Sequence, residues 1–318
     1  MNAKPIVSII VPNYNHEPYL KQRLDSVFNQ SFQDFEVILL DDCSTDASVQ
    51  LLQLYANHPK VSHFIINKKN TGSPFKQWQK GIALAKGEYI WIAESDDYCE
   101  VNFLEKMVQL FAENKHAGVA YCQTMDVNEF GELLLHRIDY TQEFKPNIWE
   151  RNFEINGFQF VEKYLSVKNV IPNASAVVFK EELVTNSIFS KVLVEMRMCG
   201  DWFFWIQLLL KSNVVFLAKP LNYFRNHSNV SRQHTTIEIQ KRRLIEEAQI
   251  RNYMKTKNIY NSKSVNELYF KWFGLHQFSS IFTSDFYKVK EDKIFGFNFV
   301  WYFLKPKLVK KIHGIAKK

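Results

Sequence analysis

The sequence predicts an α/β protein with a doubly wound, mostly parallel sheet, and two patterns carry this prediction. Over roughly the first hundred residues, short apolar runs rich in β-branched residues alternate with segments whose apolar residues recur at helical spacing. Such alternation is typical of parallel strands connected by helices that cover both faces of a sheet. Polar or acidic segments follow the strands directly, so right-handed connections should gather these segments at one edge of the sheet.

Each element of this first part is expected from its own residues. The four expected strands are residues 6–11, 35–40, 61–66 and 87–93. Helices are expected from about Glu17 to Asn29, from a cap at Ser44 or Asp46 to Tyr55, and from Phe75 to Ala85. Pro12 should close the first strand because proline cannot donate to a sheet ladder, and Gly87 should end the third helix.

After residue 97 the alternation becomes less regular. An amphipathic helix is expected at residues 102–113 and a buried helix at residues 202–210. Further strands are expected at residues 118–122, 174–179, 214–217 and 221–224. Residues 128–132 should form a turn, the polar and aromatic segment 140–156 a mobile loop, and the chain from residue 236 onward amphipathic helices.

The acidic segment Glu94-Ser95-Asp96-Asp97 follows the fourth expected strand and is the strongest functional signal. In an open α/β sheet, ligands bind in the crevice at the carboxyl ends of the strands. Clustered carboxylates repel one another unless a cation joins them, and Mg²⁺ and Mn²⁺ favour oxygen ligands and often bridge to phosphates. A solvated acidic turn is the alternative. Because neither common glycine-rich phosphate motif is present, a metal ion is the natural means of holding phosphate groups.

Composition restricts the classes of protein. The chain has 318 residues, a net charge of +7 and a pI of about 9.0, which suits anionic partners. The basic residues cluster at the C-terminal end and not along a groove, so nucleic acid is a poor fit as a partner. The four cysteines form no C-x-x-C pair, so we expect reduced thiols rather than a zinc site or a disulfide framework. Neither a signal peptide nor a membrane-spanning helix is expected.

A series of short motifs extends this interpretation to a family. The motifs are Val7-Ser-Ile-Ile-Val-Pro-Asn-Tyr-Asn, Asp41-Asp-Cys-Ser-Thr-Asp, Asn70-Thr-Gly, Gly87-Glu-Tyr-Ile, Glu94-Ser-Asp-Asp and Gly200-Asp-Trp. Each alone is weak, but in this order they are highly specific. The series resembles family 2 glycosyltransferases, which have the GT-A type of fold, and it covers roughly residues 5–232. The resemblance implies an inverting enzyme that transfers a sugar from a nucleotide-sugar donor, with UDP as the expected nucleotide.

The resemblance also implies roles for individual residues. Asp201 matches the family's catalytic base, Asp96 matches the metal ligand of its Asp-x-Asp motif, and His227 lies where many members have a histidine near the metal and diphosphate. Tyr14 is expected to lie against the nucleotide base and Asp42 to hydrogen-bond it. The residues expected to bind the donor are Pro12, Tyr14, Asn15, Asp41, Asp42, Lys76, Glu94 and Ser95. The expected cofactor is Mn²⁺ or Mg²⁺.

Other interpretations of these residues remain open at this point. Asp201 also suits the first turn of its helix as a capping acid, and Asp42 suits a turn. Tyr14 could be an exposed loop aromatic, and His227 a capping or core histidine.

Two features depart from the family pattern. Many members carry an Ala-Arg-Asn segment whose arginine approaches the diphosphate, whereas this chain has no arginine there and offers Lys76 or Lys80 instead. Glu94 replaces the first aspartate of the metal motif and is longer by one methylene. Arg225 and Arg232 are either surface charges or further contacts to the diphosphate.

The chain is expected to divide into a GT-A domain of residues 1–232 and a helical, aromatic and basic region of residues 233–318. Within the domain, about residues 1–97 should bind the nucleotide sugar and residues 98–232 should form the acceptor side. The aromatic run 295–304 and the lysines after it suit a chain that lies on an anionic membrane. A core helix packed on the catalytic domain, with a solvated tail, is the alternative.

The function expected from these observations is sugar transfer to a glycan or polyprenyl-linked acceptor in the synthesis of a cell-surface polysaccharide. The expected location is the cytoplasm, with attachment to the inner face of the cell membrane left open. A metal-dependent nucleotidyltransferase is an alternative, although the segment after the first strand is not the glycine-rich basic loop typical of that class. A nucleotide-sugar-binding protein without activity is the other alternative, and the presence of Asp96 and Asp201 argues against it.

Overall fold

The computed structural model describes residues 4–227, 236–291 and 294–315, with side chains up to residue 305. The chain forms two compact units, residues 1–231 and residues 232–318, and each unit is described by itself.

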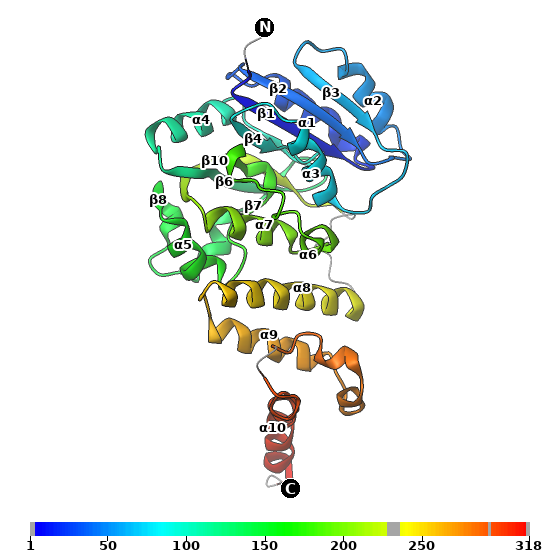
Figure 1. The fold of residues 1–318 in the computed structure, drawn as a ribbon, viewed down its shortest axis with the longest axis vertical. Coiled ribbons are helices and arrows are strands. Elements are labelled where there is room, and N and C mark those ends of the chain that lie inside the picture. The colour runs from blue at the N-terminus through cyan, green and yellow to red at the C-terminus, as the bar shows by residue number, and fades with distance from the viewer. Residues whose placement is uncertain (1–3, 228–235, 292–293, 316–318) are drawn as a thin grey trace. The chain divides into compact units, whose positions relative to one another are not determined.

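One ten-stranded sheet organises the first unit, in the order β3-β2-β1-β4-β9-β6-β10-β5 (Figure 1). The parallel half contains β1 (Val7–Asn13), β2 (Phe35–Asp41), β3 (Val61–Ile66) and β4 (Tyr89–Ile92). The other half contains β5 (Tyr98–Cys99), β6 (Ala117–Val127), β7 (Leu133–His136), β8 (Phe153–Ile155), β9 (Val177–Lys180) and β10 (Asn213–Arg225). Strand β9 runs antiparallel between β4 and β6, and β6 pairs in parallel with β10. The predicted α/β fold class is confirmed.

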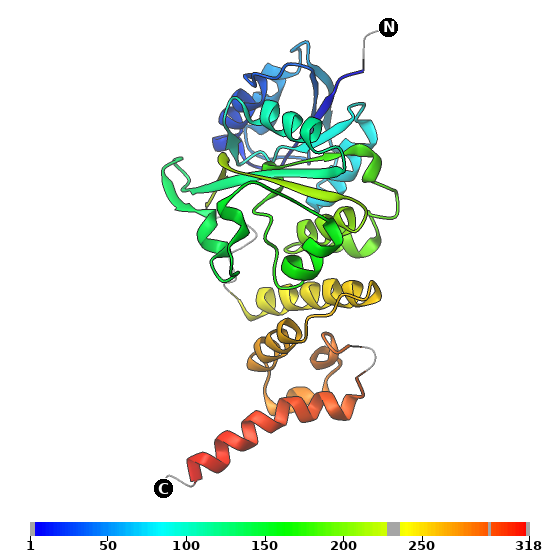
Figure 2. The same cartoon turned by 90° about the vertical axis from the view of Figure 1, so that its left-hand side faces the viewer.

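Helices cover both faces of this sheet, as the two views in Figures 1 and 2 show. The helices are α1 (Glu17–Phe28), α2 (Ser48–Tyr55), α3 (Pro74–Leu84), α4 (Phe103–Glu113), α5 (Gly157–Phe160), α6 (Lys191–Glu195) and α7 (Gly200–Leu209). Because side chains alternate along a strand, Ile9 packs in one core cluster with Leu24 of α1, while Ile10 faces α3. A Cβ atom added at Gly81 of α3 would lie 2.4 Å from the Ile10 side chain, so α3 packs closely on β1.

Three local expectations were wrong. Pro12 does not close β1, which continues to Asn13, because pairing with β4 stops at Ile10 and leaves no ladder bond there for Pro12 to make. Gly87 does not cap α3, which ends at Leu84; its role is to allow close approach, since an added Cβ would lie 2.5 Å from the backbone nitrogen of Ser8. The two strands expected at residues 214–217 and 221–224 are one strand, β10, with a register shift between Leu217 and Pro220.

The segment expected as a mobile loop at residues 140–156 carries regular structure. It contains the end of the 3₁₀ turn Arg137–Thr141, the 3₁₀ turn Ile148–Glu150 and strand β8. Trp149 anchors it, since its side chain is buried and its indole nitrogen donates to the hydroxyl of Tyr121 at 2.7 Å. Three further short helical segments belong to this unit: Val161–Leu165, Ala174–Ala176 and Glu181–Leu183.

The second unit is helical. It contains α8 (Ile237–Thr256), α9 (Ser262–Gly274), α10 (Gly296–Ile315) and the 3₁₀ turns Phe278–Phe282 and Ser284–Tyr287. Helix α10, the long helix toward the C-terminus in Figure 2, has two aromatic faces. Phe299 and Phe303 are buried in the core of this unit, whereas Phe297 is 80% and Trp301 is 49% exposed. A helix packed within its own unit therefore also presents aromatic side chains to solvent.

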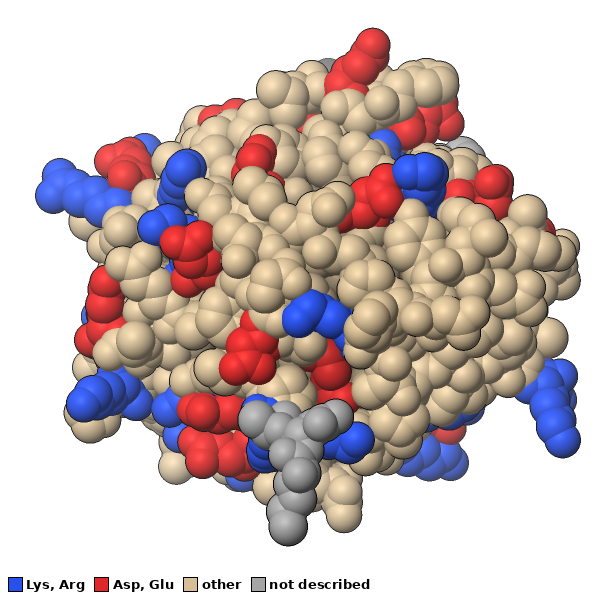
Figure 3. Space-filling model, turned by 90° about the horizontal axis from the view of Figure 1, so that it is seen from above, with Lys and Arg blue, Asp and Glu red and all other residues tan. Residues whose placement is uncertain are grey.

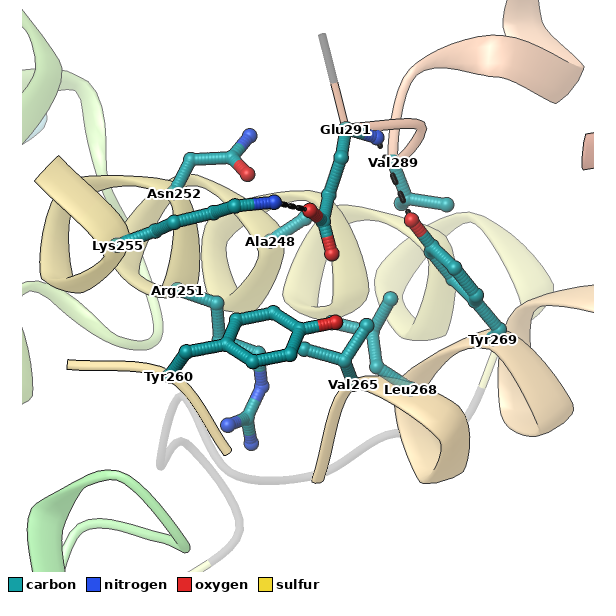
Figure 4. Close-up of a pocket in the computed structure, with 10 residues that line it drawn as sticks. All are labelled: Ala248, Arg251, Asn252, Lys255, Tyr260, Val265, Leu268, Tyr269, Val289 and Glu291. Carbon is teal, nitrogen blue, oxygen red and sulfur yellow. Dashed lines mark hydrogen bonds and ion pairs between the residues drawn. The ribbon is translucent and has the colours of Figure 1, made fainter. Parts of the chain in front are cut away.

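A hollow lies between α8 and α9, and its charged groups pair with one another (Figure 4). Lys255 forms an ion pair with Glu291, whose backbone nitrogen donates to the hydroxyl of Tyr269 at 3.3 Å. Arg251 pairs with Glu247 at 2.6 Å. This arrangement explains how charged side chains are accommodated inside a small helical unit.

No helix in the described part of the chain combines the length and the apolar character needed to cross a membrane. On the face seen in Figure 3, Lys and Arg side chains are interspersed with Asp and Glu. The described residues on that face thus form a mixed surface rather than a continuous basic stripe.

Candidate functional site

The ends of β1 and β2 are joined by hydrogen bonds that fix both loops. The buried carboxylate of Asp41 accepts from the Asn13 side chain at 2.8 Å and from the Ser44 hydroxyl at 2.6 Å. The Asn15 side chain accepts from the backbone nitrogen of Thr45 at 2.7 Å. Asn15 has a φ of 55°, a left-handed conformation that asparagine tolerates better than most residues. The predicted donor-binding residues Asn15 and Asp41 therefore build a rigid platform at the strand ends.

Asp42 is held by the segment that connects β3 to α3. Its carboxylate accepts from the Asn67 side chain at 2.6 Å, from the Thr71 hydroxyl at 2.8 Å and from the Gln77 side chain at 2.8 Å. The backbone nitrogen of Thr71 adds a further bond at 3.0 Å. Asp42 is buried, and its hydrogen bonds connect the end of β2 to the start of α3.

Glu94 begins the acidic loop and is half-buried against α3. Its carboxylate accepts from the indole nitrogen of Trp78 at 2.7 Å, and its backbone nitrogen donates to the hydroxyl of Ser175 at 3.1 Å. Burial, together with the negative charge of Asp96, raises the pKa of Glu94 to about 8. Near neutral pH and without a cation, Glu94 is therefore mainly protonated.

Asp96 meets two histidines. The Nε2 atom of His227 lies 3.1 Å from a carboxylate oxygen of Asp96, and the ring of His16 lies 5.5 Å from that of His227. Burial alone would raise the pKa of Asp96, but the hydrogen bond with His227 and the nearby histidine charges lower it to about 2. Burial lowers the pKa of His16, so the contact with His227 is the interaction that chiefly keeps Asp96 ionised.

The donor atoms at this point fit a divalent cation. In the described part of the chain, ligand atoms of His16, Asp96 and His227 all lie within 4.8 Å of one another. Carboxylate oxygens suit Mn²⁺ and Mg²⁺, and imidazole nitrogens suit transition-metal ions, so this mixed donor set can hold a divalent metal ion. The structure thus brings together Asp96 and His227, the two residues predicted to hold a metal.

Asp97 points away from this group and is structural. Its carboxylate accepts from the Asn173 side chain at 2.5 Å and from the backbone nitrogen of Arg225 at 3.0 Å, and it is buried. Burial and the charge of Asp96 raise the pKa of Asp97 to about 6. Adjacent acids therefore have different environments, one facing the histidines and one facing the sheet.

Two buried arginines support the acidic loop from behind. Arg225 donates to the backbone oxygen of Asp96 at 2.8 Å and to the Gln22 side chain at 2.5 Å, while Arg23 donates to the backbone oxygen of Glu94 at 2.8 Å. Arg225 is buried, so its interpretation as a surface charge was wrong. Arg232 lies outside the described residues.

Asp201 lies in the first turn of α7, and a close approach brings that turn to α3. A Cβ atom added at Gly200 would lie 2.2 Å from the ring of Phe75, which explains the glycine before Asp201. The carboxylate of Asp201 accepts from the Asn169 side chain at 3.0 Å and from the backbone nitrogen of Trp202 at 2.7 Å. Asp201 is partly exposed, so its carboxylate is oriented by these bonds and remains accessible to solvent.

The remaining predicted residues occupy different positions around these loops. Tyr14 is 43% exposed, as a side chain that stacks on a ligand requires, whereas Pro12 is buried within β1. Lys76 is exposed and lies 3.4 Å from the backbone oxygen of Thr71, and Lys80 donates to the Asn67 side chain at 2.6 Å. Lys76 is therefore the less engaged of the two lysines considered as substitutes for the family's arginine.

Sequence reasoning missed several residues of the site. Ser95 was assigned to the donor, but its hydroxyl lies 2.8 Å from Nδ1 of His16, a residue that received no role. The signal for His16 was available, since it directly follows the Asn-Tyr-Asn segment at the end of β1. Asn169 and Arg197 were also missed; the Arg197 guanidinium would lie 3.0 Å from a Cβ added at Gly72. Only the folded chain brings these two residues to the loops of the site.

The first half of the sheet is parallel, as in nucleotide-binding proteins, and carries acids at its strand ends. The second half contains parallel and antiparallel pairs, and a further acid follows in α7. This combination defines a protein with the GT-A type of fold. The sequence model of the family described as "Glycosyl transferase family 2" matches residues 8–170. The chain belongs to this family.

Similar proteins include surface-polymer enzymes. The chain is 36% identical over 128 residues to "Poly(ribitol-phosphate) beta-N-acetylglucosaminyltransferase TarS" of Staphylococcus aureus, a match that covers 39% of this chain and 22% of that protein. It is 33% identical over 143 residues to a hyaluronan synthase of Pasteurella multocida, covering 45% of this chain and 14% of that protein. The chain thus spans less than a quarter of the length of these two relatives.

Solved structures share the fold. TarS residues 1–349 in complex with UDP align with a TM-score of 0.60 at 21% identity, covering 89% of this chain and 80% of that one. A mannosyltransferase from Pyrobaculum calidifontis, in complex with GDP-Man and Mn²⁺, aligns with a TM-score of 0.52 at 15% identity, covering 91% of this chain and 73% of that one. These likenesses support the predicted GT-A fold.

Proposed function

We propose that the chain is a metal-dependent, inverting glycosyltransferase that moves a sugar from a nucleotide-sugar donor to a hydroxyl group. The observation that carries this proposal is the pairing of an ionised Asp96 with His227 at the strand ends of a family 2 fold. Family membership favours sugar transfer over the alternative of nucleotidyl transfer.

The donor is proposed to be UDP-linked. TarS, whose fold this chain shares, has been solved with UDP and with UDP-GlcNAc. The exposed ring of Tyr14 offers a surface for the base, and the rigid loop around Asp42 forms the adjacent wall of polar groups. The GDP-Man bound to the mannosyltransferase makes a guanine nucleotide the competing donor class.

Asp201 is proposed as the base for the acceptor. Its carboxylate takes the proton of the acceptor hydroxyl, the hydroxyl oxygen bonds to the anomeric carbon, and the bond from that carbon to the phosphate oxygen breaks. Attack opposite the leaving group inverts the configuration. The bonds from the Asn169 side chain and the Trp202 backbone nitrogen hold the carboxylate of Asp201 in place, and a carboxylate within reach of an acceptor hydroxyl can take its proton.

A bound Mn²⁺ or Mg²⁺ would offset the charge that develops on the leaving diphosphate. Asp96 and His227 are the residues proposed to hold it, and the buried arginines behind the loop keep Asp96 in place.

Residues 98–232 are proposed to bind the acceptor, a glycan or a polyprenyl-linked sugar used for a cell-surface polysaccharide. The support is a small hollow lined by Tyr140, Trp149 and Val170. Val170 directly follows Asn169, the residue that orients Asp201. Aromatic side chains of this kind suit sugar rings, which present apolar faces as well as hydroxyl groups.

The second unit is proposed to contact an anionic membrane surface on the cytoplasmic side. The exposed side chains of Phe297, Trp301 and Lys305 lie at successive four-residue intervals on α10, which places them on one helical face. Phe297→Ser with Trp301→Ser should reduce binding to liposomes that contain anionic lipid, whereas Phe130→Ser, at a residue 80% exposed in the first unit, should not. Equal binding by all three proteins would contradict this proposal.

A panel of nucleotide sugars, each tested with and without Mn²⁺, provides the direct test of function. A UDP-sugar should raise the melting temperature in the presence of Mn²⁺ and should release UDP when an acceptor is supplied. Stabilisation without release in any acceptor mixture would favour the inactive-protein alternative.

Asp201→Asn tests the proposed base. Asparagine keeps the size of the side chain but cannot take the proton, so transfer should fall by roughly 10²–10⁴-fold while donor binding changes little. The melting temperature should stay close to that of the wild type, since asparagine also suits a helix start. Glu195→Gln, at an exposed acid of α6, is the control. Normal transfer by Asp201→Asn would show that Asp201 only caps its helix.

A further inference from the structure

The turn between β1 and α1 places a third potential ligand beside Asp96 and His227. His16 occupies the residue before α1, yet its side chain makes no capping hydrogen bond to the helix. Its ring instead turns toward the acidic loop, where a ring nitrogen lies within 4.8 Å of ligand atoms of both Asp96 and His227. Three separate segments thus contribute one group each: the residue before α1, the loop between β4 and β5, and the chain after β10.

One ring nitrogen of His16, Nδ1, has a partner in the acidic loop. Nδ1 lies 2.8 Å from the hydroxyl of Ser95, which is buried within the acidic loop. If Nδ1 carries the hydrogen and donates it to Ser95, Nε2 keeps a lone pair for a metal. Metal-binding histidines commonly have their other ring nitrogen hydrogen-bonded in this way, which fixes the tautomer and the ring orientation.

We propose that His16 is a direct ligand of the cation, with Ser95 as the residue that orients it. The inference rests on the proposed metal-dependent function, and it adds a second imidazole to the ligand set. Oxygen ligands suit Mg²⁺, whereas imidazole favours transition metals, so the site should prefer Mn²⁺ over Mg²⁺. A site with only Asp96 and His227 would discriminate less between the two ions.

Two substitutions separate a metal ligand from a structural histidine. His16→Asn keeps a donor near the position of Nδ1, so it can still bond Ser95, but it lacks any atom at the position of Nε2. His16→Gln places an oxygen or nitrogen near the position of Nε2. The matched control is His63→Asn on β3, a histidine whose ring contacts the hydroxyl of Ser62, outside the site.

The experiment measures Mn²⁺ and Mg²⁺ binding to the full chain without substrate, by the electron paramagnetic resonance signal of free Mn²⁺ and by Mg²⁺ competition. We expect His16→Asn to weaken Mn²⁺ binding by about 10–100-fold, comparable with the loss of a group that supports a metal site, and Mg²⁺ binding by less. Electron spin echo spectroscopy of bound Mn²⁺ should show two coupled nitrogens in the wild type and one in His16→Asn. His16→Gln should recover part of the affinity.

The proposal is overturned if the wild type binds no Mn²⁺, or if His16→Asn binds Mn²⁺ like the wild type with an unchanged nitrogen signal. In the second case His16 only positions the loop through Ser95. A wild type that binds Mn²⁺ through two nitrogens but transfers no sugar would contradict the proposed function and leave this ligand assignment intact. Melting temperatures of all variants show whether any loss of binding reflects unfolding.

Discussion

The loops after β2 and β4 begin with similar sequences and use their acids in opposite ways. In the first loop, Asp41 and Asp42 accept hydrogen bonds from neutral groups, among them the side chains of Asn13 and Thr71. In the second loop, three acids lie within four residues. Burial and the charge of Asp96 raise the pKa of Glu94 to about 8, whereas the hydrogen bond with His227 and the nearby histidine charges lower the pKa of Asp96 to about 2. Both loops lie beside β1, at the same edge of the sheet.

The difference shows how to separate acids that build a site from acids that act in it. A carboxylate surrounded by amide and hydroxyl donors is satisfied by the protein itself and holds loops together. A partly exposed carboxylate that is kept ionised beside two histidines offers a charged oxygen to a cation. The second environment, rather than the presence of acids, marks the functional loop.

The sharpest test of this comparison lies within the second loop. Asp96→Asn should abolish metal-dependent binding of a nucleoside diphosphate and reduce transfer by more than about 10³-fold, because the charged group of the site is lost. Asp97→Asn is the control, since Asp97 is buried against Asn173 and should affect the melting temperature more than the metal affinity. Full activity of Asp96→Asn, or undiminished activity in excess chelator, would remove the metal from the mechanism.

Asp41→Asn should show the structural role of the first loop. The new amide nitrogen is a donor and would face the donating side chain of Asn13 or Ser44, so at least one hydrogen bond would be lost. The free energy of unfolding should therefore fall by about 1–3 kcal/mol. Urea unfolding measures this loss, with Asp139→Asn at an exposed position as the control. Mn²⁺ affinity should change by less than about threefold, and a larger change would mean that the two loops do not have separate roles.

Glu94 provides the smallest effect, which depends on pH. Its pKa is about 8 in the folded protein, above the usual carboxyl value of 4.5, so between these values the folded state keeps a proton that the unfolded state has lost. Stability should therefore fall as pH rises through this window in metal-free protein, by at most about 1.4 kcal/mol per pH unit. Glu94→Gln should flatten this dependence, measured by unfolding in chelator from pH 5.5 to 8.5. Parallel curves for the two proteins would contradict the assignment.

Sequence patterns were sufficient for the parallel half of the fold because each strand and helix there is marked by local periodicity. The errors arose at residues whose conformation is determined by contacts with distant parts of the chain. Glycine is common at helix ends, which suggested that Gly87 caps α3. The glycine is instead required because the backbone of Ser8 in β1 lies too close for a side chain. Pro12 lies inside β1 because β4 is too short to pair beside it, which local sequence does not reveal.

For the site, the motif order indicated Asp96, His227 and Asp201, residues that follow strands or begin a helix. The supporting residues could not be found in this way. Arg225 begins a polar segment of the sequence that is typical of a surface loop. Only the fold shows that its side chain is buried and donates a hydrogen bond to the backbone oxygen of Asp96. Asn169 lies far from Asp201 in sequence, and no local pattern pairs them.

The end of β10 fixes two parts of the candidate site at once. Arg225, which donates to the backbone of Asp96, and His227, which contacts the carboxylate of Asp96, are separated by a single residue. A register change at the end of this strand would therefore displace the acidic loop and the histidine that faces it together.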